Sequence, residues 1–370
     1  MDALGIINFE DNVATVEGLG EFRPVPAMAF LGRYRVIDFI LSNMTNSGID
    51  NVHVYCKEKP RNLFAHLGTG SYYNINNKRG QLRILFGEKS FSSPVYNHDI
   101  ANFILNMQYI EADHNPYVIV APSYFIYSIN FNTILEEHIK SKADVTMLYT
   151  NTNEAKEKYL GCDTLTLDEK KKVTYIGRNR GNTKNKQISL EAYVMSKKLF
   201  IDLVNKAAET SSLYWFKDIL RDMVGELNMR GYQIKGFVAC VNSISQYFKA
   251  NMALKDRAVA ASLFKADWPI YTQTNDSSPS TYAEGSNVSS SVIANGCLIE
   301  GTISNSIISR NVTVSKGAVV KDSIVLPGSY IGENAKLDHV IVDKYAIIHH
   351  VKELKGTEDD PIYVKRRDRI

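Results

Sequence analysis

Several basic residues near the start of the chain could together bind a phosphate group. They are Arg23, Arg33, Arg35, Lys57, Lys59 and Arg61. The planar guanidinium group of arginine matches the geometry of phosphate oxygens, and lysine adds a compact positive charge. The cluster predicts a site for a phosphorylated small molecule. The alternative is ordinary surface charge, with Arg35 and Asp38 forming a structural ion pair.

The four cysteines offer little chemistry, because they are too far apart in the sequence for a zinc knuckle. They are Cys56, Cys162, Cys240 and Cys297. We expect each of them in a strand or in the core as a free thiol rather than in a disulfide. No metal site and no redox chemistry is predicted.

Charge and hydropathy exclude two classes of function. The formal net charge of +3 is too small to indicate a nucleic-acid surface. The apolar stretches are far shorter than the roughly 20 residues of a membrane-spanning helix. The chain begins Met1-Asp2-Ala3, without a basic segment before an apolar run. We therefore expect a cytoplasmic protein that binds neither nucleic acid nor membrane.

The first part of the chain alternates short apolar runs with segments of helical period, which is typical of an α/β domain with a mostly parallel sheet. The expected strands are Ala3–Ile7, Asn51–Cys56, Tyr117–Val120 and Ala143–Tyr149. A helix is expected over Val36–Met44, ended by Gly48, and a second over about Ser212–Arg230. We assign residues 1–263 to this domain.

The composition changes after residue 263. Residues 264–285 are rich in turn formers and are predicted to be a linker. Residues 286–370 then show branched apolar residues near every sixth position, which indicates a parallel β-helix with these side chains inside. They are Val288, Ile293, Ile299, Ile307, Val312, Val319, Val325, Ile331 and Leu337. Roughly three to four coils of about 18 residues fit between Asn287 and Ile348; a short β-sandwich is the alternative.

The segment 32–43, Gly-Arg-Tyr-Arg-Val-Ile-Asp-Phe-Ile-Leu-Ser-Asn, closely resembles the bacterial ADP-glucose pyrophosphorylase (glucose-1-phosphate adenylyltransferase) family. Further matches are Asn46–Ile49, Tyr193-Val194, Lys217–Ile219 and Gln246–Asn251, so the resemblance covers almost the whole chain. It implies a Rossmann-like nucleotidyltransferase domain followed by a C-terminal left-handed β-helix. It also implies a tetramer assembled partly through the β-helices, in the pathway that makes ADP-glucose for glycogen.

The chain departs from this family where catalysis needs phosphate-binding glycines and Mg²⁺-binding carboxylates. The two metal-binding aspartate positions correspond to Tyr124 and Cys240, and neither residue is a good Mg²⁺ ligand. The glycine-rich loop corresponds to Asn8–Val13, which has no glycine. The family segment whose lysine binds the sugar phosphate is not recognisable between Val173 and Gln187. The family's Gly-Thr-Ala-Asp nucleotide segment is replaced here by Asn97–Ala101, Asn-His-Asp-Ile-Ala.

These losses resemble the non-catalytic GlgD-type subunit of the family. The resemblance implies a regulatory or activating subunit that forms a heterotetramer with a catalytic GlgC-type subunit, or else a homo-oligomer. It implies no catalytic residue, metal or cofactor in this chain, with Mg²⁺ expected only in the catalytic partner.

Two enzymatic alternatives remain. In the first, the chain is an active glucose-1-phosphate adenylyltransferase, converting ATP and glucose 1-phosphate to ADP-glucose and diphosphate. Its lost metal ligands would be replaced by Asp11, Asp99 or Asp113. In the second, it is an acyltransferase of the hexapeptide-repeat class with His339, His349 or His350 as the base.

The resemblance also implies remnant binding sites. Ser189, Tyr193, Lys217 and Asp218 match the sugar-phosphate segment of the family and could line a remnant pocket. Glu191 stands where the family has glycine, and its bulk and negative charge are expected to weaken binding of glucose 1-phosphate. The basic cluster described above corresponds to the region where family members receive phosphorylated effectors.

Overall fold

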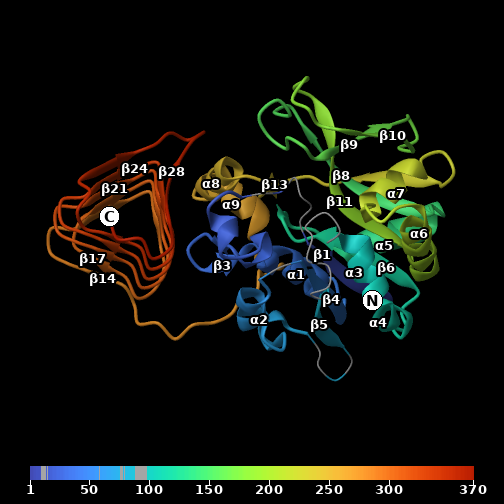
Figure 1. Cartoon of the computed structure of the whole chain (residues 1–370), viewed down its shortest axis with the longest axis horizontal. Coiled ribbons are helices and arrows are strands. Elements are labelled where there is room, and N and C mark those ends of the chain that lie inside the picture. The colour runs from blue at the N-terminus through green and yellow to red at the C-terminus, as the bar shows by residue number, and fades with distance from the viewer. Residues whose placement is uncertain (10–13, 15, 58, 76–77, 79, 88–97) are drawn as a thin grey trace.

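A mixed sheet of nine strands lies at the centre of the first domain (Figure 1). The computed structural model describes residues 1–9, 14, 16–57, 59–75, 78, 80–87 and 98–370. The strands are β1 (Ala3–Asn8), β4 (Asn51–Cys56), β5 (Gln81–Phe86), β6 (Tyr117–Pro122), β8 (Val145–Thr152), β9 (Asp163–Leu167), β10 (Val173–Arg178), β11 (Lys186–Ser196) and β12 (Met229–Gln233). Their order is β10-β9-β11-β6-β1-β4-β5, and β8 joins β11 to β12. The predicted strands correspond to β1, β4, β6 and β8.

Strands β5, β4, β1 and β6 run parallel, as predicted, whereas β11 is antiparallel to both β6 and β8. Parallel strands place their carboxyl ends at one edge of a sheet. The residues that follow β1 and β6 therefore lie side by side, and Ser123 N–H donates to the Asn8 carbonyl at 2.8 Å. This edge carries the candidate site described below.

Helices cover both faces of the sheet. Successive side chains of a strand point to opposite faces, and both faces are apolar here. In β1, Ala3 and Ile7 belong to one apolar cluster, whereas Leu4 and Ile6 belong to the other. The first cluster includes residues of α1 (Val36–Asn46), α2 (Arg61–Leu67), α5 (Phe131–Ser141), α8 (Ile244–Ala253) and α9 (Arg257–Leu263). The second includes residues of α3 (Asp99–Leu105), α4 (Met107–Glu111), α6 (Lys197–Thr210) and α7 (Phe216–Asp222).

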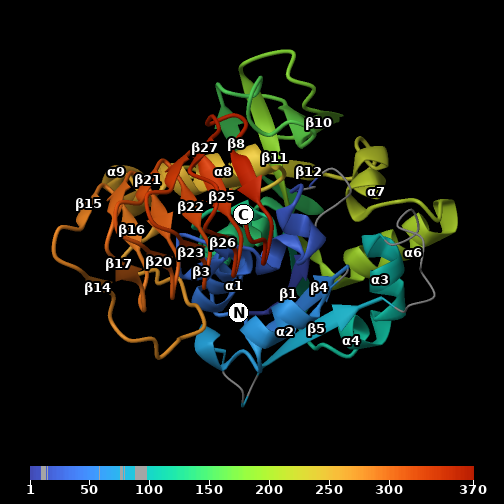
Figure 2. The same ribbon diagram turned by 60° about the vertical axis from the view of Figure 1, so that its left-hand side comes forward.

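The second domain is a left-handed parallel β-helix of three five-stranded sheets (Figures 1 and 2). One sheet contains β14 (Thr281–Tyr282), β17 (Leu298–Ile299), β20 (Thr313–Val314), β23 (Tyr330–Ile331) and β26 (Ile347–Ile348). The second contains β15 (Asn287–Ser289), β18 (Thr302–Ser304), β21 (Val319–Lys321), β24 (Lys336–Asp338) and β27 (Glu353–Lys355). The third contains β16 (Val292–Ile293), β19 (Ile307–Ile308), β22 (Ile324–Val325), β25 (Val340–Val342) and β28 (Ile362–Val364).

The third sheet of the β-helix packs against the α/β domain. Three isoleucines form a stripe on successive coils of this sheet: Ile307, Ile324 and Ile341. All three are buried in the same apolar cluster as α1. The neighbouring residues Ile308, Val325 and Val342 instead belong to the interior of the β-helix. The two domains therefore share a continuous apolar contact.

The expectations for the β-helix need three corrections. Strand β14 lies within the segment predicted as linker, so the stack begins before residue 286 and has more coils than the range 287–348 suggested. Ile307 faces the other domain rather than the interior. Val319 is only partly buried, and Val320 is the interior residue there. The predicted repeat is present in the stacked strands, but a shift of one residue in a strand exchanges its two faces.

The helix predicted over Ser212–Arg230 is wrong in extent. Helix α7 covers only Phe216–Asp222, and Gly225 with φ +99° lies in the turn that follows. The chain then forms β12, which pairs with β8 in parallel. Pairing with the sheet thus outweighs the helical period of the sequence in this segment. The preceding helix α6 is not among the predicted helices.

Three smaller expectations are confirmed. Helix α1 occupies the predicted position, and Gly48 beyond it has φ +79°, the conformation a helix stop requires. All four cysteines are buried free thiols. Among the described residues, no helix has both the length and the apolar character that crossing a membrane requires.

Candidate functional site

Tyr124 and Cys240, the positions equated with metal carboxylates, lie next to each other in the fold. Tyr124 precedes β7 (Phe125–Ile126), and Cys240 ends β13 (Ala239–Cys240); these two short strands pair antiparallel. The Val241 amide donates to the Tyr124 carbonyl at 2.9 Å. Both side chains are buried, with 2% of Tyr124 and 3% of Cys240 exposed. The structure thus brings together two positions that are far apart in the sequence.

The groups at these two positions do not fit Mg²⁺. The Tyr124 hydroxyl donates to Glu191 Oε2 at 2.7 Å. The Cys240 sulfur lies 3.6 Å from the buried Cys162 sulfur. Mg²⁺ prefers carboxylate, phosphate and water oxygens in octahedral geometry, so a phenol and two cysteine sulfurs are a poor donor set.

A small cavity lies beside these residues at the carboxyl edge of the sheet. Its lining includes two of the four predicted remnant-pocket residues, Tyr193 and Lys217, together with Glu191, Asn8 and Asp99. The Lys217 ammonium forms an ion pair with Glu191 Oε1 at 3.2 Å. Burial raises the pKa of the Tyr193 hydroxyl well above its usual range, so this group stays neutral. The cavity volume is about 20 Å³.

The other two predicted pocket residues do not line this cavity. Ser189 is fully buried, and its hydroxyl accepts from the Glu191 amide at 3.2 Å. Asp218 accepts from the Trp215 amide at the start of α7 and pairs with Arg221 at 2.9 Å. Both residues hold local backbone in place.

The acids proposed as replacement metal ligands are placed elsewhere or are already engaged. Asp99 accepts from the Asn8 side chain at 2.7 Å and from the Phe216 amide at 3.0 Å. Its burial raises its pKa to about 7, so a fixed negative charge is disfavoured there. Asp113 precedes β6, whereas Tyr124 follows it, so the two lie at opposite edges of the sheet. Asp11 lies outside the described residues.

Aromatic and imidazole groups stand where the family pattern has a phosphate loop and a nucleotide segment. Phe9 is buried and packs edge-on against Trp215, with ring centroids 5.8 Å apart. His98 caps α3, accepting from the Ala101 amide through Nδ1, and its Nε2 faces the Ser212 carbonyl at 2.5 Å. Desolvation by burial lowers the pKa of His98, which favours the neutral ring. The segment 10–13 of the loop and Asn97 lie outside the described residues.

Arg23 does not stand on the surface but joins the two domains. Its Nη2 donates to both carboxylate oxygens of Asp343 in the β-helix, at 2.8 and 2.7 Å. Arg23 is 2% exposed and Asp343 is fully buried. The Tyr363 hydroxyl also donates to Asp343 at 2.7 Å. No local sequence pattern indicates Asp343 as the partner, because 320 positions separate it from Arg23.

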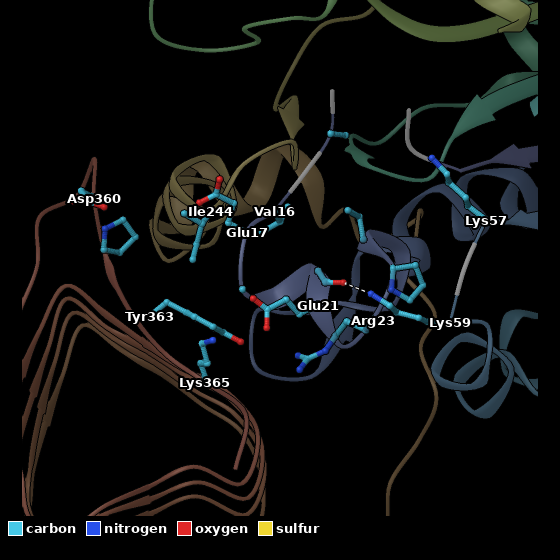
Figure 3. A pocket seen from close by; sticks show the side chains of 16 residues that line it. Val16, Glu17, Glu21, Arg23, Lys57, Lys59, Ile244, Asp360, Tyr363 and Lys365 are labelled. Atoms are coloured by element: carbon cyan, nitrogen blue, oxygen red, sulfur yellow. Dashed lines mark hydrogen bonds between the residues drawn. The ribbon is translucent and has the colours of Figure 1, made fainter. Parts of the chain in front are cut away.

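A cavity of about 680 Å³ opens beside Arg23, between the first domain and the β-helix (Figure 3). Its basic lining residues are Arg23, Lys57, Lys59 and Lys365, and its acidic ones are Glu17, Glu21 and Asp360. Lys59 donates to the Gly20 carbonyl at 2.9 Å. The cavity therefore gathers three of the six predicted basic residues and adds Lys365, which the sequence analysis missed.

The remaining basic residues are dispersed. Arg33 stacks on Tyr34 and lines a separate cavity with Arg310. The Arg35 guanidinium donates to the Ala27 carbonyl, and it is the Arg35 backbone amide that donates to Asp38, at 2.8 Å. Arg61 begins α2 and lines neither cavity. The predicted cluster is thus not one site.

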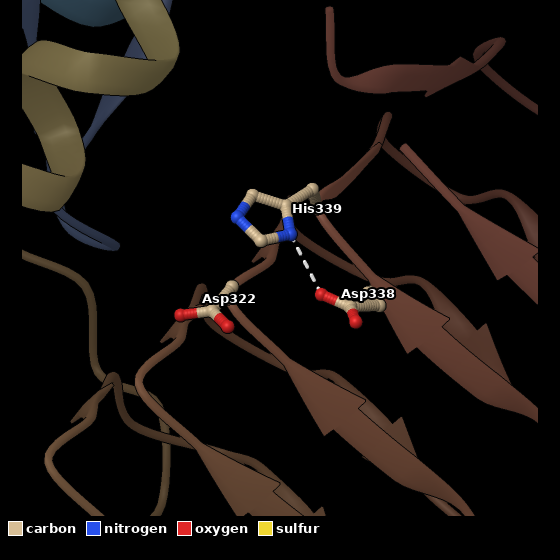
Figure 4. A group of neighbouring side chains, drawn as sticks. All are labelled: Asp322, Asp338 and His339. Carbon is tan, nitrogen blue, oxygen red and sulfur yellow. Dashed lines mark hydrogen bonds and ion pairs between the residues drawn. The ribbon is translucent and has the colours of Figure 1, made fainter. Parts of the chain in front are cut away.

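The β-helix carries one group of metal-ligand type among the described residues: Asp322, Asp338 and His339 (Figure 4). His339 Nδ1 lies 2.6 Å from Asp338. The ammonium of Lys321 lies 3.4 Å from Asp322 and 3.7 Å from Asp338, so a cation of the protein already stands between the carboxylates. The other candidate bases, His349 and His350, are exposed, and their rings contact each other edge to face.

Both domains match known protein families. Residues 18–257 match the family described as "Nucleotidyl transferase", and residues 278–359 match "GlmU-like, C-terminal hexapeptide". The chain is 34% identical over 370 residues to "Glycogen biosynthesis protein GlgD" of Geobacillus stearothermophilus, covering 98% of this chain and 96% of that protein. The protein of the same description from Bacillus subtilis (strain 168) is 27% identical, covering 98% and 95%.

A "Glucose-1-phosphate adenylyltransferase" of Bacillus thuringiensis (strain Al Hakam) is 27% identical over 329 residues, covering 87% of this chain and 86% of that protein. The nucleotidyl transferase match covers more than half of the chain, and the Geobacillus protein is matched over nearly its whole length. The chain therefore belongs to the nucleotidyl transferase family, within its GlgD-type ADP-glucose pyrophosphorylase branch.

Proposed function

We propose that this chain is a non-catalytic subunit of a bacterial glucose-1-phosphate adenylyltransferase, and that it acts in glycogen biosynthesis by regulating or activating a catalytic GlgC-type subunit. The observation that carries the proposal is the pair Tyr124 and Cys240. Both stand at neighbouring positions where the family resemblance expects Mg²⁺ carboxylates, and neither offers a suitable oxygen.

The surroundings of this pair support the same conclusion. Glu191 adds a carboxylate beside Lys217, and Phe9 and Trp215 fill the space beyond β1. A site that must bring ATP and a sugar phosphate together needs cations and open volume, and losing both metal carboxylates removes several kcal/mol of transition-state stabilisation. In this proposal the chain itself binds no metal or cofactor, and Mg²⁺ serves the partner.

Regulation requires that the chain bind two conformational states of its partner with different affinities. Equal binding to both states would leave the equilibrium between them unchanged. The β-helix is the proposed assembly element, and a heterotetramer is the proposed assembly, with a homo-oligomer as the alternative. The proposed location is the cytoplasm.

The test is an assay of ADP-glucose formation from ATP, glucose 1-phosphate and Mg²⁺. Three samples are compared: this chain alone, the catalytic subunit from the same genome alone, and the two mixed. We expect no turnover by this chain alone and a changed rate or substrate affinity in the mixture, with a co-eluting complex in size-exclusion chromatography. Serum albumin in place of this chain is the control. Turnover by the chain alone would overturn the proposal.

The cavity beside Arg23 favours a second role, the binding of a phosphorylated effector. Arg23 Nη1 is a buried donor to which no hydrogen-bond acceptor is assigned among the described residues, and Lys57, Lys59 and Lys365 line the same space. Buried donors of this kind gain from an anionic acceptor. The acidic residues of the lining repel an anion, so we expect moderate affinity for a phosphorylated ligand. Titration with inorganic pyrophosphate tests it, with Lys365→Ala expected to weaken binding and Arg61→Ala, outside the cavity, to leave it unchanged.

A further inference from the structure

Glu191 holds a backbone conformation that its side chain does not favour. Strand β11 loses its regular pairing with β8 between Ser189 and Tyr193, and Glu191 lies within this irregularity with φ +51°. A residue with a Cβ atom in this left-handed region costs roughly 1–2 kcal/mol relative to glycine. Such strain persists when the surroundings hold the residue in place.

The Glu191 carboxylate is held from two sides. Lys217, from α7, places its ammonium 3.2 Å from Oε1, and the Tyr124 hydroxyl donates to Oε2 at 2.7 Å. The ion pair is largely buried, with 11% of the Glu191 side chain and 7% of the Lys217 side chain exposed. An ammonium and a hydroxyl converging on two oxygens is a typical arrangement for binding a phosphate group.

Little space is left beside this carboxylate. The cavity there has a volume of about 20 Å³, room for about one water molecule. Asn8, Trp215 and Phe216 close its other sides. An oxyanion the size of phosphate fits only if the Glu191 side chain is absent.

We propose that Glu191 is a built-in anion that occupies a phosphate subsite formed by Lys217 and Tyr124, and that it keeps phosphomonoesters out of this chain. This goes beyond the proposed subunit role, because it concerns what the site can bind and not what the chain does for a partner. Removing the side chain exchanges an internal carboxylate for an external phosphate at the same two donors.

The experiment uses the full-length chain and four variants: Glu191→Gly, Glu191→Asn, Glu191→Gln, and the double variant Glu191→Gly with Lys217→Met. Glycine suits the left-handed conformation, and asparagine tolerates it while leaving more room, so one variant remains informative if the other folds poorly. Glutamine keeps the bulk but removes the charge. Binding of inorganic phosphate and of glucose 1-phosphate is measured by isothermal titration calorimetry, after circular dichroism has shown that each variant is folded.

We expect Glu191→Gly and Glu191→Asn to bind phosphate at least about tenfold more tightly than the unchanged chain, which corresponds to about 1.4 kcal/mol. Glu191→Gln should resemble the unchanged chain, because the site stays filled, and the double variant should lose the gain. Equal binding by the unchanged chain and Glu191→Gly, or an undiminished gain in the double variant, would overturn the inference. Phosphate binding by these variants does not measure turnover, so the proposed subunit role is tested separately by the assay of ADP-glucose formation.

Discussion

At the scale of single residues, the polar side chains of the candidate site form contacts with one another. The Tyr124 phenol and the Lys217 ammonium both contact Glu191, and the Cys240 thiol contacts Cys162. In the proposed subunit role, the side chains at these positions contact other side chains of the protein instead of a substrate or a metal ion. Restoring one such group leaves its former partners in place, and this limits what a point substitution can recover.

The first prediction concerns recovery of activity. We expect the double variant Tyr124→Asp and Cys240→Asp to form no ADP-glucose above background. The new carboxylate at position 124 would stand beside Glu191, where like charges repel, and no glycine loop follows β1. The variant should also melt several degrees below the unchanged chain. A coupled assay of diphosphate release and a thermal melt measure both effects; clear turnover would contradict the prediction.

The second prediction concerns pH. Burial lowers the pKa of Lys344 to about 7, with Arg35, Arg23 and Arg366 adding to the effect and Asp343 opposing it. Between pH 7 and the usual lysine pKa of about 10.4, the unfolded chain binds this proton and the folded chain does not. The free energy of unfolding should therefore rise with pH across this window.

Substituting Lys344→Met should flatten that part of the pH dependence, as measured by urea unfolding at several pH values. The exposed Lys336→Met serves as the control and should leave the dependence unchanged. An unaltered slope in Lys344→Met would show that Lys344 keeps its charge in the folded protein.

At the scale of elements, a contact with the β-helix holds the two 3-10 helices between β1 and α1 in place. The segment around Arg23 lies between η1 (Leu19–Glu21) and η2 (Val25–Ala27) and is joined to the loop after β25 through the Arg23–Asp343 pair. A buried ion pair adds modest net stability over apolar residues, but breaking it leaves an uncompensated buried charge.

The third prediction follows from this asymmetry. We expect Arg23→Met to lower the free energy of unfolding by about 3–5 kcal/mol, because the Asp343 carboxylate stays buried without its cation. The double variant Arg23→Met with Asp343→Leu should recover much of the loss. Urea unfolding of both variants, analysed as a double-mutant cycle with Asp343→Leu alone, measures the coupling; additive effects would contradict the prediction.

At the scale of the whole molecule, the β-helix is part of the core of the protein, in addition to its proposed role in assembly. The stripe of Ile307, Ile324 and Ile341 extends the apolar cluster of the first domain into the second. Phe248 of α8 also contacts His339, with ring centroids 6.0 Å apart. Removing the β-helix would expose this surface, so a truncated first domain is expected to aggregate more readily.

The fourth prediction tests this contact. We expect Ile324→Asp to lower the melting temperature by about 5 °C or more, because it buries an unpaired charge between the domains. The chain should also become more sensitive to proteolysis within residues 264–280. Leu298→Asp, at a 39% exposed position on the outer surface of the β-helix, is the matched control and should change little. Equal effects of both substitutions would argue against a close contact.

Features that depend on local patterns and motifs can be predicted from the amino-acid sequence alone. Helix α1 with its stop at Gly48, the strands β1 and β4, and the repeat of the β-helix follow from periodicity and turn chemistry over a few residues. The substitutions at Tyr124 and Cys240 could be found by matching motifs along the chain. These inferences need no knowledge of which distant segments meet.

Which side chains meet depends on how distant segments pack in the folded protein. The contact of Glu191 with Lys217 and Tyr124, and the pair Arg23–Asp343, join residues from 26 to 320 positions apart. The segment 212–230 reads as one helix but becomes α7 and β12, because β8 offers an open edge for pairing. Long-range contacts of this kind outweigh local preference, since burial and sheet pairing are worth more than helix propensity.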